Sequence, residues 1–234
     1  MFALTLDAPG KNALGLALME SVIARLRDAA GEPVLVTGAG DAFSAGLNLK
    51  EVAALDRRAG GRFLGVLEDM VEALFAYPGP MVAAVNGHAI AGGCVVALAA
   101  DYRVLASAPQ VRIGLNEVAL GLEYPPKVFA LVRHRVPPRG LERVVLEAGL
   151  YDPATALQLG LVDELAADPV AVATARLATL ATHPRRAYVE TKRTLRAGVL
   201  DVSEARRRWF LEELVPAWVT PEVKARVADA LRKR

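Results

Sequence analysis

The chain has 234 residues, of which 53% are hydrophobic and 23% are charged, and its formal net charge is +2 at pH 7. This balance argues against a nucleic-acid-binding protein, and no run reaches the ~18 apolar residues that a membrane-spanning helix needs. The only cysteine, Cys94, excludes an internal disulfide and a multi-cysteine metal site. We therefore expect a cytoplasmic protein that binds neither nucleic acid nor a membrane.

Short apolar runs alternate with helical patterns in the first part of the chain. Strands are expected at residues 2–6, 33–37, 81–85 and 102–105, and helices at residues 15–30 and 62–76. Short strands that alternate with helices indicate βα units. The pattern therefore predicts an α/β fold with mostly parallel strands and helices that cover the sheet.

The pattern becomes mainly helical after about residue 137. Asp201 and Glu204 form a variant of the capping box, and Thr220-Pro221-Glu222 is a second helix start. Three large aromatic residues gather in this part of the chain, namely Trp209, Phe210 and Trp218. We expect these helices to bury them both on their own core and on another subunit.

Two loops of small residues each join an expected strand to an expected helix. The first lies in VTGAGDAFSAGLNLK (36–50), and the second lies in VNGHAIAGGCVVALAAD (85–101). Each glycine at a helix start costs ~1 kcal/mol relative to alanine, so the pair at Gly92 and Gly93 needs a reason. Close approach of a ligand and tight helix packing both remain open as reasons. An ordinary strand-to-helix turn also fits the first loop.

The segment IGLNEVALG (113–121) places Glu117 among apolar neighbours. This carboxylate either faces water or is held in a partly dry pocket. If each loop offers one N–H group to a single oxygen, the two loops form an oxyanion hole. An acid in an apolar setting beside such a hole can act as a base on the carbon next to the polarised carbonyl.

Three segments resemble the crotonase superfamily, also called the enoyl-CoA hydratase/isomerase family. They are AFSAGLNL (42–49), AVNGHAIAGGCVVALAADYRV (84–104) and IGLNEVALG (113–121). The resemblance implies a spiral of ββα units over residues 1–184 and a C-terminal helical region, 185–234, used in trimer assembly. It also implies an acyl-CoA thioester substrate, no separate cofactor or metal, and a homotrimer or dimer of trimers.

The resemblance also implies roles for individual residues. In the family pattern, the N–H groups of Ala45 and Gly92 hold the thioester oxygen as it gains enolate charge. Enoyl-CoA hydratases use two glutamates, and the corresponding positions here are Val95 and Glu117. The substrate-binding residues expected on the same basis are Ala45, Gly46, Leu47, Asn48, Leu49, Gly92 and Asn116.

One acid suits a double-bond shift better than the addition of water. Glu117 would remove a proton from C2 of a 3-enoyl thioester and return it at C4. In this respect the chain resembles the mitochondrial-type Δ3,Δ2-enoyl-CoA isomerases, and we expect weak hydratase activity. Asn48 stands where many relatives have Asp, and we expect it to cap a helix.

Other functions stay open at this point. The protein could be an enoyl-CoA hydratase, another crotonase-type acyl-CoA enzyme, or a binding protein without turnover. The run TGAGDAFSAG (37–46) also resembles sugar kinases of the ribokinase type, in which Asp41 would activate the sugar. That kinase motif normally lies late in a longer chain, and the other two segments have no role in a kinase.

Overall fold

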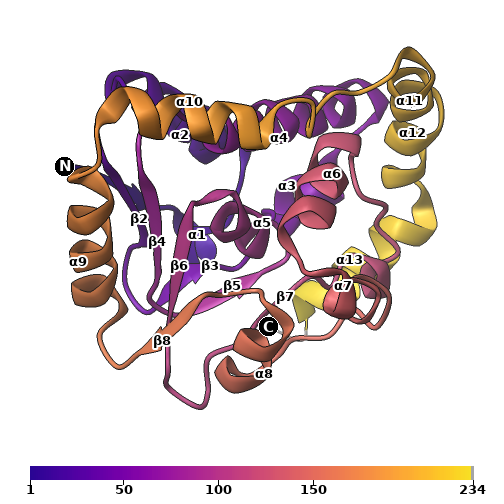
Figure 1. Ribbon diagram of the computed structural model, residues 1–234. Coiled ribbons are helices and arrows are strands. Elements are labelled where there is room, and N and C mark those ends of the chain that lie inside the picture. Colours follow the sequence, from indigo (N-terminus) through magenta and orange to yellow (C-terminus); the bar gives the residue numbers. More distant parts are fainter. Residues whose placement is uncertain (233–234) are drawn as a thin grey trace.

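The structure is a computed structural model that describes residues 1–232 (Figure 1). Five parallel strands form the larger sheet in the order β1-β2-β4-β6-β8, and three parallel strands form a smaller sheet in the order β3-β5-β7. The larger sheet contains β1 (Phe2–Leu6), β2 (Val34–Gly38), β4 (Met81–Val85), β6 (Tyr102–Ala106) and β8 (Glu164–Ala166). The smaller sheet contains β3 (Ala42–Ser44), β5 (His88–Ile90) and β7 (Ile113–Gly114).

The chain passes from the larger sheet to the smaller sheet and then into a helix three times. Thus β2 and β3 precede α3, β4 and β5 precede α5, and β6 and β7 precede α6. The predicted α/β spiral of ββα units is therefore confirmed. The helices of the first part are α1 (Pro9–Asn12), α2 (Leu16–Asp28), α3 (Leu49–Ala54), α4 (Arg57–Phe75), α5 (Gly92–Ala99) and α6 (Pro126–Arg135). The later ones are α7 (Pro138–Leu146), α8 (Pro153–Leu159), α9 (Pro169–Ala181), α10 (Arg185–Arg196), α11 (Glu204–Trp209), α12 (Val215–Trp218) and α13 (Pro221–Arg232), with the short helical turns η1 (Val118–Leu120) and η2 (Phe210–Leu214).

The larger sheet is covered on both faces, which explains why β4 is apolar at every position. Val82 and Ala84 pack with Ala173 and Leu177 of α9 on one face. Ala83 and the other alternate residues belong to the main core, which α2 and α4 share on the opposite face. A parallel sheet buried on both faces requires such continuous apolar runs. Helix α5 is buried at all of its residues and lies inside the spiral.

Helix starts follow local capping chemistry. The Asp56 carboxylate caps α4 by accepting a hydrogen bond from Ala59 N–H at 2.8 Å. The helix therefore begins at Arg57, five residues before the expected start. The prediction at Thr220 is confirmed, since its Oγ1 accepts from Val223 N–H at 3.4 Å. The capping box at Asp201 is wrong: Ser203 caps α11 instead, accepting from Arg206 N–H at 3.3 Å.

The C-terminal helices fold back on the chain's own core. The Trp218 side chain is 2% exposed, and its Nε1–H donates to Glu123 O at 3.0 Å. Helix α13 packs on α3 and on η1, with Val223 and Val227 buried beneath it. In Figure 1, α10 lies at the same end of the molecule as α2 and α4, whereas α11 to α13 lie at the other side. Burial on the same chain is confirmed for Phe210 and Trp218, whereas Trp209 is only half-buried against the core. Packing on another subunit stays a prediction.

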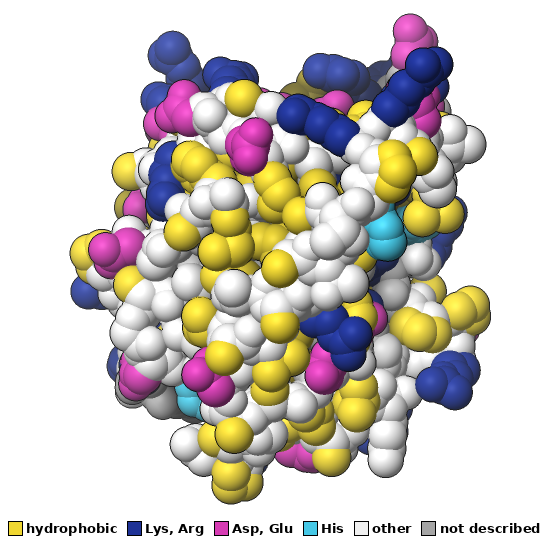
Figure 2. All heavy atoms as spheres, turned by 60° about the vertical axis from the view of Figure 1, so that its left-hand side comes forward, with side chains coloured by type: hydrophobic (Ala, Val, Ile, Leu, Met, Phe, Trp, Pro, Cys, Tyr) yellow, Lys and Arg dark blue, Asp and Glu magenta, His cyan; other side chains and the backbone are white. Residues whose placement is uncertain are grey.

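Charge is distributed unevenly over the surface. Figure 2 shows Lys and Arg side chains gathered at the end of the molecule where α2 and α10 lie, while hydrophobic side chains are spread over the middle of that face. On α10, Arg185, Arg186 and Arg193 are exposed. In the described part of the chain, no helix is both long enough and apolar enough to cross a bilayer.

Candidate active site

The smaller sheet brings the three sequence motifs to one edge. Ser44 of β3 pairs with Ala89 of β5, and Ile90 of β5 pairs with Gly114 of β7, all in parallel. The carboxyl ends of parallel strands lie at the same edge of a sheet, so the segments that follow them are neighbours. Residues 45–48, 91–92 and 115–117 therefore follow the strands at this one edge.

The Glu117 side chain is buried rather than exposed to water. Its residue is 7% exposed, and its backbone carbonyl accepts hydrogen bonds from Leu120 and Leu122, which fix the turn η1. The Tyr124 hydroxyl donates to Glu117 Oε2 at 3.0 Å. Burial raises the pKa of Glu117 to about 7, although hydrogen bonds from its own amide and from Tyr124 act in the opposite direction. A carboxyl with this proton affinity can accept and return a proton near neutral pH.

Gly92 provides one amide at the edge where the three motifs meet. It is the first residue of α5, so its N–H belongs to the helix-start amides that have no acceptor within the helix. A Cβ built at Gly92 would lie 3.6 Å from Leu47 N and 3.0 Å from Leu14 Cδ1. The absence of a side chain thus leaves space directly in front of the Leu47 amide.

The structure corrects the expectation that Ala45 supplies the second amide. Ala45 N–H donates to Lys11 O at 2.9 Å and is engaged within the protein. Leu14 and Leu47 form a parallel bridge, in which Leu14 N–H donates to Gly46 O at 2.8 Å and Asn48 N–H donates to Leu14 O at 3.0 Å. In such a bridge the N–H and C=O of Leu47 itself point away from Leu14. The amide close to Gly92 is therefore that of Leu47.

Gly46 allows the two loops to approach each other. Its φ is +83°, a left-handed conformation that glycine adopts without strain. A Cβ at this position would lie 2.5 Å from Ile90 O and 3.4 Å from Gly92 N. Any side chain at residue 46 would push the loops apart.

Asn48 is confirmed as a helix cap. Its Oδ1 accepts hydrogen bonds from Lys50 N–H at 3.2 Å and Glu51 N–H at 3.5 Å, and its Nδ2 donates to Glu51 Oε1 at 2.8 Å. Leu49 is 5% exposed and packs in the main core. These two residues therefore hold the first loop in place, and their contact with a substrate stays a prediction.

Asn116, beside the acid, carries a buried oxygen that lacks a partner. Within residues 1–232, Asn116 Oδ1 has no hydrogen-bond donor. An unpaired buried acceptor costs about 1–3 kcal/mol, and native structures rarely tolerate one without a reason. A donor from a bound ligand or from water would remove this cost, which agrees with the predicted role of Asn116 in substrate binding.

The other residues named from the sequence are structural. Val95 is 1% exposed, and Cys94 is fully buried, with a thiol pKa raised by burial and by the charge of Glu117. The side chain of Asp41 is 81% exposed and pairs with Lys11 at 3.3 Å. A buried, protonated thiol and a solvated carboxylate are both unsuited to the roles of nucleophile or base. Among the described residues, no group of His, Cys, Asp and Glu is arranged to hold a metal ion.

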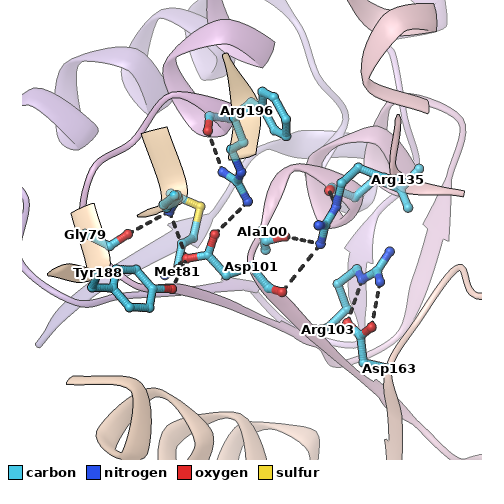
Figure 3. Close-up of polar contacts among 12 residues, drawn as sticks. Gly79, Met81, Ala100, Asp101, Arg103, Arg135, Asp163, Tyr188 and Arg196 are labelled. Atoms are coloured by element: carbon cyan, nitrogen blue, oxygen red, sulfur yellow. Dashed lines mark hydrogen bonds and ion pairs between the residues drawn. The ribbon is translucent and has the colours of Figure 1, made fainter. Parts of the chain in front are cut away.

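Two polar features escaped the sequence analysis. Tyr124 is the first, and the sequence gives no local signal for its contact with Glu117. The second is a buried cluster around Asp101, which lies two residues after the end of α5 (Figure 3). Its carboxylate accepts from Tyr188 Oη at 2.8 Å, Lys192 Nζ at 2.8 Å and Arg196 Nη2 at 2.6 Å. This cluster ties α10 to the end of the helix that begins with Gly92.

Comparison with known proteins agrees with this geometry. The family model described as enoyl-CoA hydratase/isomerase matches residues 1–213. The human protein named enoyl-CoA delta isomerase 1, mitochondrial, is 32% identical over 162 residues, which cover 67% of this chain and 54% of the human protein. The Mycobacterium tuberculosis protein named "probable enoyl-CoA hydratase EchA17" is 30% identical over 225 residues, which cover 89% of this chain and 83% of that protein.

The fold comparison gives the same result. The crystal structure of human mitochondrial delta3-delta2-enoyl-CoA isomerase superposes with a TM-score of 0.92 at 26% sequence identity, covering 99% of this chain and 92% of that one. In sequence, the chain spans about half the length of the human, mouse and rat isomerases that it matches. The family match over most of the chain and the shared fold lead to one conclusion: the chain belongs to the enoyl-CoA hydratase/isomerase family.

Proposed function

We propose that the protein is an acyl-CoA double-bond isomerase that moves a C3–C4 double bond to C2–C3. The observation that carries this proposal is a single buried carboxylate, Glu117, at the edge where the Leu47 and Gly92 amides meet, with Val95 at the position of the second acid. The family supplies the substrate class, a coenzyme A thioester, and no further cofactor is proposed.

The reaction needs only one base. Glu117 accepts the proton from C2 of a 3-enoyl thioester, and the electrons of that C–H bond form the enolate. The negative charge on the thioester oxygen is stabilised by hydrogen bonds from the Leu47 and Gly92 N–H groups. Glu117 then returns the proton to C4, where the electrons of the C3–C4 π bond form the new C4–H bond. The enolate electrons form the C2–C3 double bond and the thioester carbonyl is restored, so that atoms and charge balance.

The surroundings of Glu117 support reversible transfer of this proton. A pKa of about 7 means that neither the carboxylate nor the carboxylic acid is strongly favoured at neutral pH. Each donor to an oxyanion contributes roughly a factor of 10²–10³ to the rate in other enzymes. The unpaired Oδ1 of Asn116 supports contact with an N–H group of the substrate.

Water addition is the second candidate, and the mycobacterial relative named as a hydratase favours it. Hydration requires a water to be deprotonated while C2 is protonated, and a pair of carboxylates suits this task. Val95 offers no carboxylate, so we place hydration behind isomerisation. The sugar-kinase alternative is dropped, because the chain belongs to a different family and Asp41 is solvated.

Product analysis tests the proposal. Purified protein is incubated with cis- and trans-3-enoyl, 2-enoyl and 3-hydroxyacyl thioesters of several chain lengths, and the products are separated by chromatography. We expect 3-enoyl thioesters to become 2-enoyl thioesters, with little 3-hydroxyacyl product. Hydration of the 2-enoyl thioester at a comparable rate would reverse the ranking. A homotrimer or dimer of trimers stays a prediction, which sedimentation equilibrium would test.

A further inference from the structure

Tyr124 is the polar side chain in direct contact with the proposed base. Its hydroxyl lies 3.0 Å from Glu117 Oε2, and both residues are buried, at 8% and 7% exposure. The Tyr124 ring also packs on Phe129 of α6, with 5.7 Å between the ring centroids. The phenol is thus held between the turn η1 and α6, and packing fixes its direction.

The backbone around the pair is also fixed. Glu117 O accepts a hydrogen bond from Leu122 N–H at 3.0 Å, and Gly121 ends η1 in a left-handed conformation with φ +73°. Pro125 and Pro126 follow Tyr124 and begin α6. Two fixed backbone segments therefore set the distance between the hydroxyl and the carboxylate.

The phenol can act only as a donor in this contact. Burial and the charge of Glu117 raise the pKa of Tyr124, so its hydroxyl keeps its proton. A hydroxyl that donates to a carboxylate stabilises the charged form, which is the form that accepts a proton. Because Oε2 is occupied by this bond, Oε1 is the oxygen left to approach a substrate.

We propose that Tyr124 is a positioning residue for the isomerase: its hydroxyl holds Glu117 Oε2, keeps the carboxylate in its basic form and leaves Oε1 to carry the migrating proton. This inference depends on the proposed function. The titratable and charged groups near Glu117 are few: the buried Cys94 thiol of α5 faces it, and Arg226 of α13 lies beside Gly121. Among the described residues, Tyr124 provides the one side-chain hydrogen bond to the carboxylate, beside the bond from the Glu117 amide.

The first test compares the pH dependence of kcat/KM for the wild type and Tyr124→Phe. Loss of one hydrogen bond to a charged group should move the acid limb upward by about one pH unit. We expect kcat near pH 6.5 to fall about tenfold with little change in KM, because the substrate contacts remain. Incorporation of 3-fluorotyrosine at position 124, a stronger donor of similar shape, should move the limb downward.

Tyr77→Phe is the matched control. Tyr77 is also buried, at 4% exposure, and its hydroxyl donates to Glu32 O at 2.6 Å on another part of the protein. This variant should reproduce the wild-type pH profile. A Tyr124→Phe profile that superimposes on the wild type would overturn the role of Tyr124.

A second measurement does not depend on turnover. The carboxyl of Glu117 is titrated by infrared difference spectroscopy, with Glu117→Gln used to assign its band. The midpoint should rise by about one pH unit in Tyr124→Phe. If the Glu117 titration midpoint moves but the wild type does not isomerise a 3-enoyl thioester, the proposed function fails and the Tyr124–Glu117 interaction stands. If the wild type isomerises and neither readout moves, the inference fails alone.

Discussion

The burial of Glu117 predicts a pH-dependent change in stability that does not require a substrate. Its carboxyl has a pKa of 4.5 when solvated and about 7 in the folded protein. The folded state therefore disfavours ionisation, so stability falls as pH rises from about 4.5 to about 7 and changes little above that range. The gap between these pKa values corresponds to about 3 kcal/mol.

Glu117→Gln removes this dependence, because the amide stays neutral and can still accept a hydrogen bond from Tyr124. Urea unfolding is measured from pH 4.5 to pH 8.5 at one protein concentration, since any assembly would make stability concentration-dependent. The free energy of unfolding of the variant should exceed that of the wild type by nearly nothing at pH 4.5 and by about 3 kcal/mol above pH 7. The same variant should lose isomerase activity by roughly 10²–10⁴-fold.

The control is Glu123→Gln, which changes an exposed glutamate six residues away. The difference in free energy of unfolding between Glu123→Gln and the wild type should not grow as the pH rises. A difference between Glu117→Gln and the wild type that stays constant from pH 4.5 to pH 8.5 would mean that the Glu117 carboxyl is solvated. That result would remove the physical basis for using it as a base near neutral pH.

Three further variants test other parts of the site. Gly92→Val should lower kcat by roughly 10²-fold or more, because a Cβ at this position would lie 3.6 Å from Leu47 N and fill the space for the enolate oxygen. The control Gly65→Ala, whose Cβ would meet nothing within 4 Å, should have the kcat of the wild type. Val95→Glu should add hydration of 2-enoyl thioesters, measured as 3-hydroxyacyl product, and no gain would mean that a second acid is not what hydration lacks. Asp101→Asn should lower the free energy of unfolding at pH 7 by about 3–5 kcal/mol in urea titrations, because Lys192 and Arg196 lose their buried charge partner; an unchanged midpoint would show that this cluster is not stabilising.

Much of the larger sheet was accessible from sequence because its strands are continuous apolar runs. Residues 2–6 and 81–85 form strands with the predicted bounds, and the cap at Asn48 followed from its side-chain chemistry. The smaller sheet was not recognised as strands, because β3, β5 and β7 have only two or three residues each, too few for a periodic pattern. These short strands nevertheless bring the three motifs together.

The sequence identified Glu117, Gly92 and Asn116 as candidate site residues, but it did not predict the hydrogen bonds around them. Glu117 was recognised because a charge stands among apolar neighbours. Whether Ala45 or Leu47 presents its amide depends on Lys11 and Leu14, more than thirty positions away, which compete for the same backbone groups. The contact between Tyr124 and Glu117 depends on how the turn η1 returns the chain towards Glu117. Neither the competition nor the turn leaves a local signal in the sequence.

Helix α5 connects the proposed oxyanion site to the cluster at Asp101. Its C-terminal carbonyls are satisfied by Arg135 of α6, whose Nε donates to Leu98 O at 2.9 Å and whose Nη2 donates to Ala100 O at 2.7 Å. Its first amide, at Gly92, lies ~12 Å away at the end where the helix dipole is positive. A cation at one end and unpaired amides at the other both favour a negative charge on a ligand oxygen beside Gly92. Because Asp101 lies two residues after the end of α5 and holds α10, loosening of that contact in Asp101→Asn should lower kcat as well as stability.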